Sequence, residues 1–384
     1  MGHAIEVPVT PSVLRWAIQE SGYDAEHIAK AAGVSIAVLK EWLSGDSKPN
    51  MTQARHLASK LHRPFAAFLL PAPPEGRRLS VEFRHPIGDR REVNPDERRY
   101  LRRAVRFQEI LSWLAKEELE LDQSRTPSAT VNEDPVEVAG AARGLFEIST
   151  AGQKRWATPA VAFDEWRLAL EATGHLVFLF SIGKDSCRGF SLWDESSPVI
   201  AVNTSWNELA RIFTLFHELG HLITRTSSAC VEPVRTASKT DPVERWCERF
   251  AAAFLLPARD VDAALRECGW RAGENIADLR IPRRVANLHK VSLRAAVIRL
   301  IELGAAAWGL YDQIPPVSDN KRPGGGGMGR NRTQIREDQL GNRATYLVRA
   351  AVENDILSRS QAVEFLDIPD PAFDELDGTG HRVG

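Results

Sequence analysis

Apolar residues recur at helical spacing through residues 11–70, with polar residues between them and no strand-like alternation. The centre of this stretch, DAEHIAKAAGVSIAVLKEWLSG, predicts two short helices joined by a tight turn. Asp24 is suited to cap the first helix, Gly33 to make the turn and Ser35 to cap the second helix. The pattern is typical of a helix-turn-helix domain. The second helix is expected to turn three apolar residues inward, namely Ile36, Leu39 and Trp42.

A long helix is predicted to begin at Asn94, after the proline-rich stretch PAPPEGRR, which predicts an extended linker. Pro95 suits the first helical position, and Glu97 would complete a capping box with Asn94. Its apolar stripe consists of Leu101, Ala104, Phe107, Leu111 and Leu114. Its other faces carry Arg98, Arg99, Arg102, Arg103 and Arg106. Such like charges at helical spacing cost stability unless acidic groups lie against them.

Three apolar or alternating runs between residues 175 and 203, HLVFLF, RGFSLW and PVIAVN, predict strands of a small sheet. A helix should follow, with Ser205 and Glu208 as its capping box, and run through ARIFTLFHELGHLI. Another helix is expected to start near Asp241, with Pro242 at its first position, and to stop at Pro257. VANLHKVSLRAAVIRLIELG predicts two further small helices. The Pro/Gly-rich stretch PPVSDNKRPGGGGMGRN predicts a flexible linker before a helical tail.

Composition restricts the classes of function. With 384 residues, 43% of them hydrophobic, the chain can bury a substantial core. It has no long uncharged apolar run and no secretion signal, and its four cysteines form no CxxC pair, so we expect a cytoplasmic protein with reduced thiols and no membrane association. A formal net charge of -2 gives no general attraction to nucleic acid. Any such binding must come from a local patch.

The string HELGH at residues 217–221 carries the most specific chemical signal. Histidines four positions apart project from one face of a helix, so His217 and His221 can both bind one zinc ion. Glu218 would lie beside them, where a carboxylate can take the proton of an attacking water molecule. A chance HExxH is the alternative, but the predicted helix and its apolar neighbours favour a metal site.

A catalytic zinc typically has three protein ligands and a water molecule, so another side chain is needed. DPVERWCERFAAAFLLP offers Glu244 and Glu248, one helical turn apart on the same face. Glu244 could instead occupy a capping-box position after Asp241, and Glu248 could be an ordinary surface residue. Because the rest of this helix is apolar and must pack inside, we expect Glu244 to be the ligand and Glu248 to orient a histidine.

These segments resemble the ImmA/IrrE-type metallopeptidases with an N-terminal Xre-like helix-turn-helix. The resemblance rests on HELGH and ERWCERFAAAFLLP, with support from AEHIAKAAGVSIAVLKEWLSG, RPFAAFLLPAPPE, WRLALEATGHLVF, RGFSLWDESSPVIAVN and VSLRAAVIRL. It implies a gluzincin-like zinc endopeptidase in which Glu244 is the third ligand. It also implies that the substrate is an Xre-type repressor, whose cleavage relieves repression in a stress response or in mobile-element control. This chain departs from the family pattern at Glu248, where asparagine is frequent.

The expected fold class is therefore α+β, with an all-helical N-terminal domain, a zincin-like metallopeptidase domain containing a small sheet, and a helical C-terminal tail. The expected boundaries are 1–75 for the helix-turn-helix, 76–124 for the linker and Arg-rich helix, 125–312 for the peptidase, 313–332 for the flexible linker and 333–384 for the helical C-terminal region. Either PVIAVN or RGFSLW is expected to form a sheet edge that holds the substrate as an added strand.

The role of the N-terminal domain stays open between DNA and protein recognition. Residues 1–75 balance basic and acidic side chains, which gives no electrostatic footprint for phosphates. The second helix of the motif would present chiefly Ala37, Lys40 and Glu41, a poor set for reading base edges. Ala37 and Lys40 are the candidate contacts to DNA or to a partner protein. The competing function is a DNA-binding regulator or antitoxin-like protein whose peptidase domain senses metal or is inactive.

Overall fold

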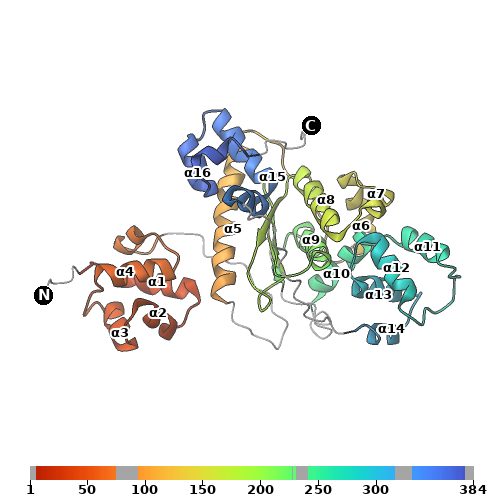
Figure 1. The fold of residues 1–384 in the computed structure, drawn as a ribbon, viewed down its shortest axis with the longest axis horizontal. Coiled ribbons are helices and arrows are strands. Elements are labelled where there is room, and N and C mark those ends of the chain that lie inside the picture. Colours follow the sequence, from red (N-terminus) through yellow and green to blue (C-terminus); the bar gives the residue numbers. More distant parts are fainter. Residues whose placement is uncertain (1–5, 75–93, 227, 231–240, 316–330, 377–384) are drawn as a thin grey trace. The chain divides into compact units, whose positions relative to one another are not determined.

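The computed structural model describes residues 6–74, 94–226, 228–230, 241–315 and 331–376 (Figure 1). The chain divides into two compact units. The first comprises Met1–Ser80 and Arg91–Arg103, and the second comprises Val81–Arg90 and Ala104–Gly384. Residues 75–78 of the predicted linker PAPPEGRR and most of the Pro/Gly-rich stretch, residues 316–330, lie outside the described residues. Within the described part of the chain, no helix combines the length and apolar character needed to cross a membrane.

The first unit is helical, and it buries a core that includes Leu14, Ile28, Leu57 and Phe68. Its elements are α1 (Pro11–Ser21), α2 (Ala25–Ala32), α3 (Ile36–Ser44), α4 (Met51–Lys60) and the short 3-10 helix η1 (Phe65–Leu69). The absence of strands from the described part of this unit agrees with the helical spacing of its apolar residues. Its identification as a helix-turn-helix remains a prediction.

The turn between α2 and α3 has the predicted chemistry. The Asp24 side chain accepts a hydrogen bond from the His27 N–H, and the Ser35 side chain accepts one from the Val38 N–H. Gly33 adopts φ 72°, a left-handed conformation that glycine reaches without steric cost. These three predictions are confirmed. The prediction for Ile36 is wrong, because as the first residue of α3 it faces solvent with 40% of its surface exposed.

Helix α5 (Pro95–Trp113) begins with the predicted capping box. The Asn94 N–H donates to Glu97 Oε2, and the Glu97 N–H donates to Asn94 Oδ1, both at 2.9 Å. Two of its arginines meet carbonyl groups near the end of α1, where the helix dipole is negative. Arg98 Nη1 donates to the Gln19 carbonyl at 3.3 Å, and Arg102 Nη1 donates to the Glu20 carbonyl at 2.5 Å. Helix carbonyls therefore partner these arginines, where the sequence had suggested acidic side chains.

The second unit contains a four-stranded mixed sheet in the order β1-β3-β2-β4. β1 (Leu176–Phe180) runs parallel to β3 (Val199–Asn203), and β2 (Gly189–Leu192) runs antiparallel to both β3 and β4 (Ser228–Cys230). The three predicted strands are confirmed, and β4 is an additional strand. The predicted edge is wrong, because β3 lies between β1 and β2, and β2 lies between β3 and β4.

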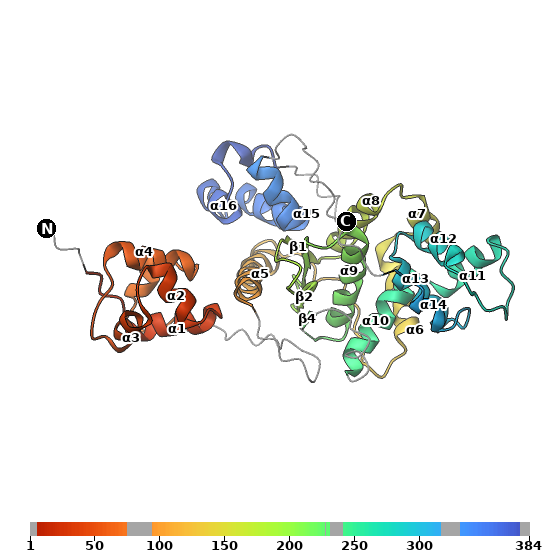
Figure 2. The ribbon, with the colours of Figure 1, turned by 60° about the horizontal axis from the view of Figure 1, so that its bottom comes forward.

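Helices cover the sheet and extend the core of the second unit (Figure 2). On one face, Val177, Ile200 and Val202 join the core formed with α8 (Pro159–Ala172) and α9 (Glu208–Ile223). On the other face, Phe178 meets Phe107 of α5 with ring centroids 5.7 Å apart. This mostly helical structure with one small sheet is of the α+β class, as expected.

The remaining helices of the second unit are α6 (Pro135–Arg143), α7 (Thr150–Arg155), α10 (Pro242–Leu255), α11 (Ala258–Glu267), α12 (Arg280–His289), α13 (Leu293–Glu302) and α14 (Gly309–Asp312), with the π-helix η2 (Leu114–Glu118) and the 3-10 helix η3 (Gly144–Phe146). Of these, α10, α12 and α13 were predicted from the sequence. The start predicted for α10 is confirmed, since the Asp241 side chain accepts from the Val243 N–H. The cap predicted for α9 is wrong. Asn207 caps this helix, whereas the Ser205 hydroxyl accepts from the Gly183 N–H.

The first of the three C-terminal helices packs on the sheet of the second unit, and the second helix packs on the first. They are α15 (Arg332–Glu353), α16 (Arg359–Leu366) and the 3-10 helix η4 (Asp370–Phe373), and α15 contacts β1 extensively. A break at Gly341, with φ 82°, lets the buried Glu171 carboxylate accept a hydrogen bond from the Asn342 N–H at 3.0 Å. Arg167 pairs with Glu171 at 3.1 Å and also donates to the Val177 carbonyl at 2.7 Å. The Val177 carbonyl of the edge strand β1 therefore already accepts a hydrogen bond from Arg167.

Candidate metal centre

Helix α9 brings its two histidines onto one face. His217 Nε2 and His221 Nε2 lie 3.3 Å apart, as expected for residues separated by one helical turn. The helix around them is packed into the core, because Phe216, Leu219 and Leu222 are fully buried. His221 is fully buried as well, whereas His217 keeps 8% of its surface exposed. Burial on a rigid helix restricts both imidazoles to one orientation.

Helix α10 brings Glu244 to the same point. Glu244 Oε2 lies 3.2 Å from His217 Nε2, and Glu244 Oε1 lies 3.3 Å from His221 Nε2. The Glu244 side chain keeps 22% of its surface exposed, so the cluster is open to water on its side. Ligand atoms of His217, His221 and Glu244 all lie within 4.8 Å of one another. Among the described residues, this is the group of histidine and acidic side chains arranged to hold a metal ion.

Buried side chains anchor the opposite end of α10. Its last carbonyls accept hydrogen bonds from Arg143, Gln153 and Arg299. The Arg143 guanidinium reaches the Phe254 carbonyl at 2.6 Å, although burial lowers the pKa of Arg143 to about 10. The two arginines lie at the negative end of the helix dipole, and all three side chains satisfy carbonyls that have no partner within the helix. The helix that carries Glu244 is therefore held at its C-terminal end.

The charges within the cluster are strongly coupled. Burial alone would lower the pKa of His217, but the hydrogen bond and negative charge of Glu244 raise it to about 9. Burial alone would raise the pKa of Glu244, but hydrogen bonds to His217 and His221 hold it well below its usual range. The carboxylate is therefore ionised, which is the form that coordinates a metal.

Comparison with known families agrees with this geometry. Residues 170–300 match the family model described as IrrE N-terminal-like domain, Peptidase_M78. Because these residues are similar to that domain, we call residues 170–300 the IrrE N-terminal-like domain. The resemblance to ImmA/IrrE-type proteins is confirmed over this region, which contains both histidines and Glu244. No curated protein and no solved structure gives a significant match to the chain.

Glu218 lies on the sheet side of α9 within the IrrE N-terminal-like domain. It is fully buried, and its charge contributes to raising the pKa of His217. Gly189 of β2 faces it, because a Cβ built on Gly189 would lie 3.5 Å from Glu218 Cγ and 2.5 Å from Thr214 Cγ2. The absence of a side chain at Gly189 lets the strand pass close to the carboxylate. Glu218 is thus held between β2 and His217.

Sequence reasoning missed Thr226 as a partner of the domain's second histidine. Thr226 Oγ1 lies 3.1 Å from His221 Nδ1, on the side of the ring away from Glu244. A hydrogen bond there fixes the ring and leaves Nε2 for the metal. A threonine five residues after a histidine, just beyond the helix end, gives no distinctive sequence signal. Glu248, the predicted orienting residue, is half-buried on α10 and acts on His217 through its charge.

The donors of the IrrE N-terminal-like domain fit a zinc ion. Two neutral imidazoles and one carboxylate form a donor set found in catalytic zinc sites, and such a set leaves a coordination position for water. In the metal-free protein, the raised pKa of His217 means that zinc would replace a proton shared with Glu244. The open side of the cluster, next to Glu244, gives access to that position.

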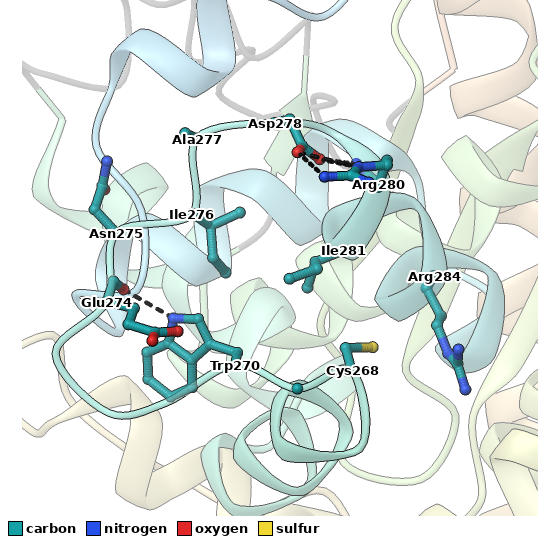
Figure 3. A pocket seen from close by; sticks show the side chains of 11 residues that line it. Cys268, Trp270, Glu274, Asn275, Ile276, Ala277, Asp278, Arg280, Ile281 and Arg284 are labelled. Carbon is teal, nitrogen blue, oxygen red and sulfur yellow. Dashed lines mark hydrogen bonds and ion pairs between the residues drawn. The ribbon is translucent and has the colours of Figure 1, made fainter.

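A separate pocket of about 410 Å³ lies between the end of α11 and the start of α12 (Figure 3). Ile276 and Ile281 contribute apolar surface to it, and Trp270 donates a hydrogen bond to the Glu274 carbonyl. Asp278 and Arg280 at its rim neutralise each other at 2.8 Å. The pocket includes none of the residues of the histidine cluster, so we do not assign the chemistry to it.

The candidate contacts outside the IrrE N-terminal-like domain lie on α3. Ala37 and Lys40 are both exposed there, in the first unit. Glu41 is exposed next to Lys40, and Ile36 adds apolar surface. The exposed residues of α3 are therefore mixed in character, and they are accessible to a binding partner.

Proposed function

We propose that this protein is a zinc-dependent endopeptidase whose metal is held by His217, His221 and Glu244. The observation that carries the proposal is the meeting of these three side chains, from two helices, inside a domain of a peptidase family. Among the described residues, Cys247 and Cys268 form no disulfide, which agrees with the reducing cytoplasm that we propose as its location.

In this proposal different residues of the chain have separate roles in peptide hydrolysis. Zinc would supply Lewis-acid chemistry, lowering the pKa of a water molecule towards ~7 and polarising the scissile carbonyl. Glu218 would accept a proton from the attacking water molecule and would then give that proton to the departing amine. Thr226 holds the His221 ring through its Nδ1 atom. The packing of Gly189 against α9 keeps Glu218 in place.

We propose that the substrate is a repressor-type helix-turn-helix protein, as the resemblance implies. Its scissile segment would be extended and would pair with a sheet edge through main-chain hydrogen bonds. With β2 and β3 inside the sheet, the edges are β1 and β4. Arg167 donates a hydrogen bond to the Val177 carbonyl of β1, and α15 packs on that strand. β4, which follows the end of α9 closely in sequence, is therefore the proposed docking edge.

We propose that the first unit docks the substrate, with Ala37 and Lys40 among the contacts. The juxtaposition of Lys40 and Glu41 and the exposed Ile36 on α3 favour a protein surface over a phosphate backbone, which prefers concentrated positive charge. The alternative is a DNA-binding regulator whose peptidase domain senses metal or is inactive. Proteolysis separates the two functions, because only the first requires Glu218.

The test of the proposed function uses Glu218→Gln. The variant should bind zinc as the wild type does, yet cleave a candidate repressor at least 100-fold more slowly, because the amide cannot accept the proton of the water. The substrate to use is a small helix-turn-helix repressor encoded next to this protein, incubated with zinc-loaded enzyme and followed by mass spectrometry. Cleavage by the variant at the wild-type rate would remove Glu218 from the mechanism.

A further inference from the structure

Helices α9 and α10 approach each other unusually closely at Gly220 and Cys247. A Cβ built on Gly220 would lie 3.1 Å from Cys247 Sγ and 3.2 Å from both Cys247 Cα and Cβ. Carbon atoms at optimal contact are about 3.5–4.0 Å apart, so even one methyl group at residue 220 would force the helices to separate. Since Cys247 Cα belongs to the backbone, side-chain rotation cannot relieve this contact.

Gly220 occupies an unfavourable place for a glycine. It lies inside α9, where glycine weakens a helix relative to alanine. It is also buried, and its φ is not among the positive values for which glycine is required. By contrast, Gly140 in α6 is exposed, and a Cβ built there would meet no atom within 4 Å. The backbone conformation of α9 therefore does not require a glycine at residue 220. The close approach of α10 does require one.

The close contact lies next to the proposed metal ligands. Gly220 is adjacent to His221 and one turn after His217, and Cys247 is one turn after Glu244. Arg143, Gln153 and Arg299 hold the carbonyls at the C-terminal end of α10. Nearer the N-terminus of α10, Trp246 Nε1 donates to the Glu133 carbonyl at 2.8 Å. A group that separates the helices at Cys247, one turn after Glu244, would therefore also shift the backbone that carries Glu244.

We propose that Gly220 is a positioning residue that sets the distance between Glu244 and the two histidines. This inference rests on the proposed function, because it concerns the same metal centre. With glycine at residue 220, α10 lies close enough for the Glu244 carboxylate to meet His217 at 3.2 Å and His221 at 3.3 Å. A larger residue there increases those separations by a few tenths of an ångström and weakens the three-ligand site.

The experiment compares the zinc affinities of Gly220→Ala, Gly140→Ala and wild type, measured by competition with a chromogenic chelator. Zinc affinity should fall about 10- to 100-fold in Gly220→Ala, the range found when a group that orients a metal ligand is lost. It should stay at the wild-type value in Gly140→Ala, which makes the same substitution in a helix without a close neighbour. Equal affinity in all three proteins would overturn the inference.

A double-mutant cycle with Glu244→Gln separates positioning from general destabilisation. If Gly220 acts through Glu244, adding Gly220→Ala to Glu244→Gln should leave the remaining zinc affinity unchanged. If Gly220→Ala lowers zinc affinity by the same factor in the wild type and in Glu244→Gln, the inference would be overturned. Thermal unfolding in chelator reports the stability of each metal-free protein. If Gly220→Ala does not fold, Gly220→Ala/Cys247→Ala takes its place in the cycle, since it removes the sulfur contact at 3.1 Å.

The outcomes also distinguish this inference from the proposed function. A wild-type protein that binds no zinc would contradict the proposed function and, with it, the inference. A wild-type protein that binds zinc, with Gly220→Ala binding it equally well, would contradict the inference alone.

Discussion

Glu244 Oε2 lies 3.2 Å from His217 Nε2, although the two residues are 27 positions apart in the chain. The contact joins α9 to α10, and it brings an ionised carboxylate to an imidazole whose pKa it raises to about 9. Two helices that bring two imidazoles and a carboxylate to one point, with one side open to water, form a site suited to a divalent cation. The account of function depends on this contact.

Comparing Glu244→Gln with Glu248→Gln tests the assignment of the third ligand. Glu244→Gln should lower zinc affinity more than 100-fold, because an amide is a poor metal ligand. Glu248→Gln should lower it by at most about 10- to 100-fold, since Glu248 is proposed to orient His217, on which it acts through its charge, and not to bind the metal. Chelator competition measures both affinities. The reverse order would exchange the roles of the two glutamates.

Thr226 provides a test of ring orientation at His221. Thr226→Val removes the hydroxyl that lies 3.1 Å from His221 Nδ1, so zinc affinity should fall about 10-fold or more. Thr226→Ser keeps a hydroxyl and should retain most of the affinity. If valine and serine lower zinc affinity equally, the hydroxyl does not orient the ring.

The exposed face of α3 provides a test of substrate docking. Ala37→Glu/Lys40→Glu should raise the Michaelis constant for a whole repressor and leave the cleavage of a short peptide that spans the scissile bond unchanged. Arg55→Glu, a charge reversal on the exposed surface of α4, is the matched control. Equal effects on both substrates would show that α3 supports the peptidase by another route.

Tight, salt-dependent binding of the wild type to operator DNA would favour the regulator alternative.

Because His175 is buried, we expect the protein to lose stability in acid. Its ring is fully buried, and burial lowers its pKa to about 4 from the ordinary 6.5. Between these values the unfolded chain binds the proton more readily than the folded chain. The contribution of neutral His175 to the free energy of unfolding is therefore complete above pH 6.5. About 3 kcal/mol of that free energy is lost as the pH falls from 6.5 to 4.

Urea unfolding at several pH values, followed by tryptophan fluorescence, measures this loss. His175→Gln should be less stable than wild type at pH 7.5, because the ring's contacts with Thr126 and Thr173 are lost. Its stability should also depend less on pH between 6.5 and 4. His56→Gln, at an exposed position on α4, should keep the wild-type dependence. An unchanged slope in His175→Gln would contradict the account of this histidine.

Local patterns predicted most of the helix caps that were proposed, because such a cap is formed by residues two or three positions apart. Asp24, Ser35, Asn94 and Asp241 all make the predicted bonds to backbone N–H groups. Ser205 failed for a local reason. Asn207 offered a better cap, and the Ser205 hydroxyl bonds to the Gly183 N–H across the fold.

Features that depend on distant residues could not be read from the sequence. β4 is only three residues long, so it carries no alternation that marks a strand. Without β4, the sequence predicts that either PVIAVN or RGFSLW forms the edge. Likewise, Gln153 and Arg299 meet the end of α10 from segments far away in the chain. The i, i+4 histidines were readable because a helix alone brings them together.

Elemental analysis of zinc in the purified protein tests the central claim most directly. The wild type, after removal of loosely bound ions, should contain about one zinc per chain, and His217→Ala and His221→Ala should each contain almost none. Circular dichroism of the same samples would show that the variants remain folded. A wild-type protein that contains no zinc and takes up none on titration would contradict the assignment of His217, His221 and Glu244 as a metal centre.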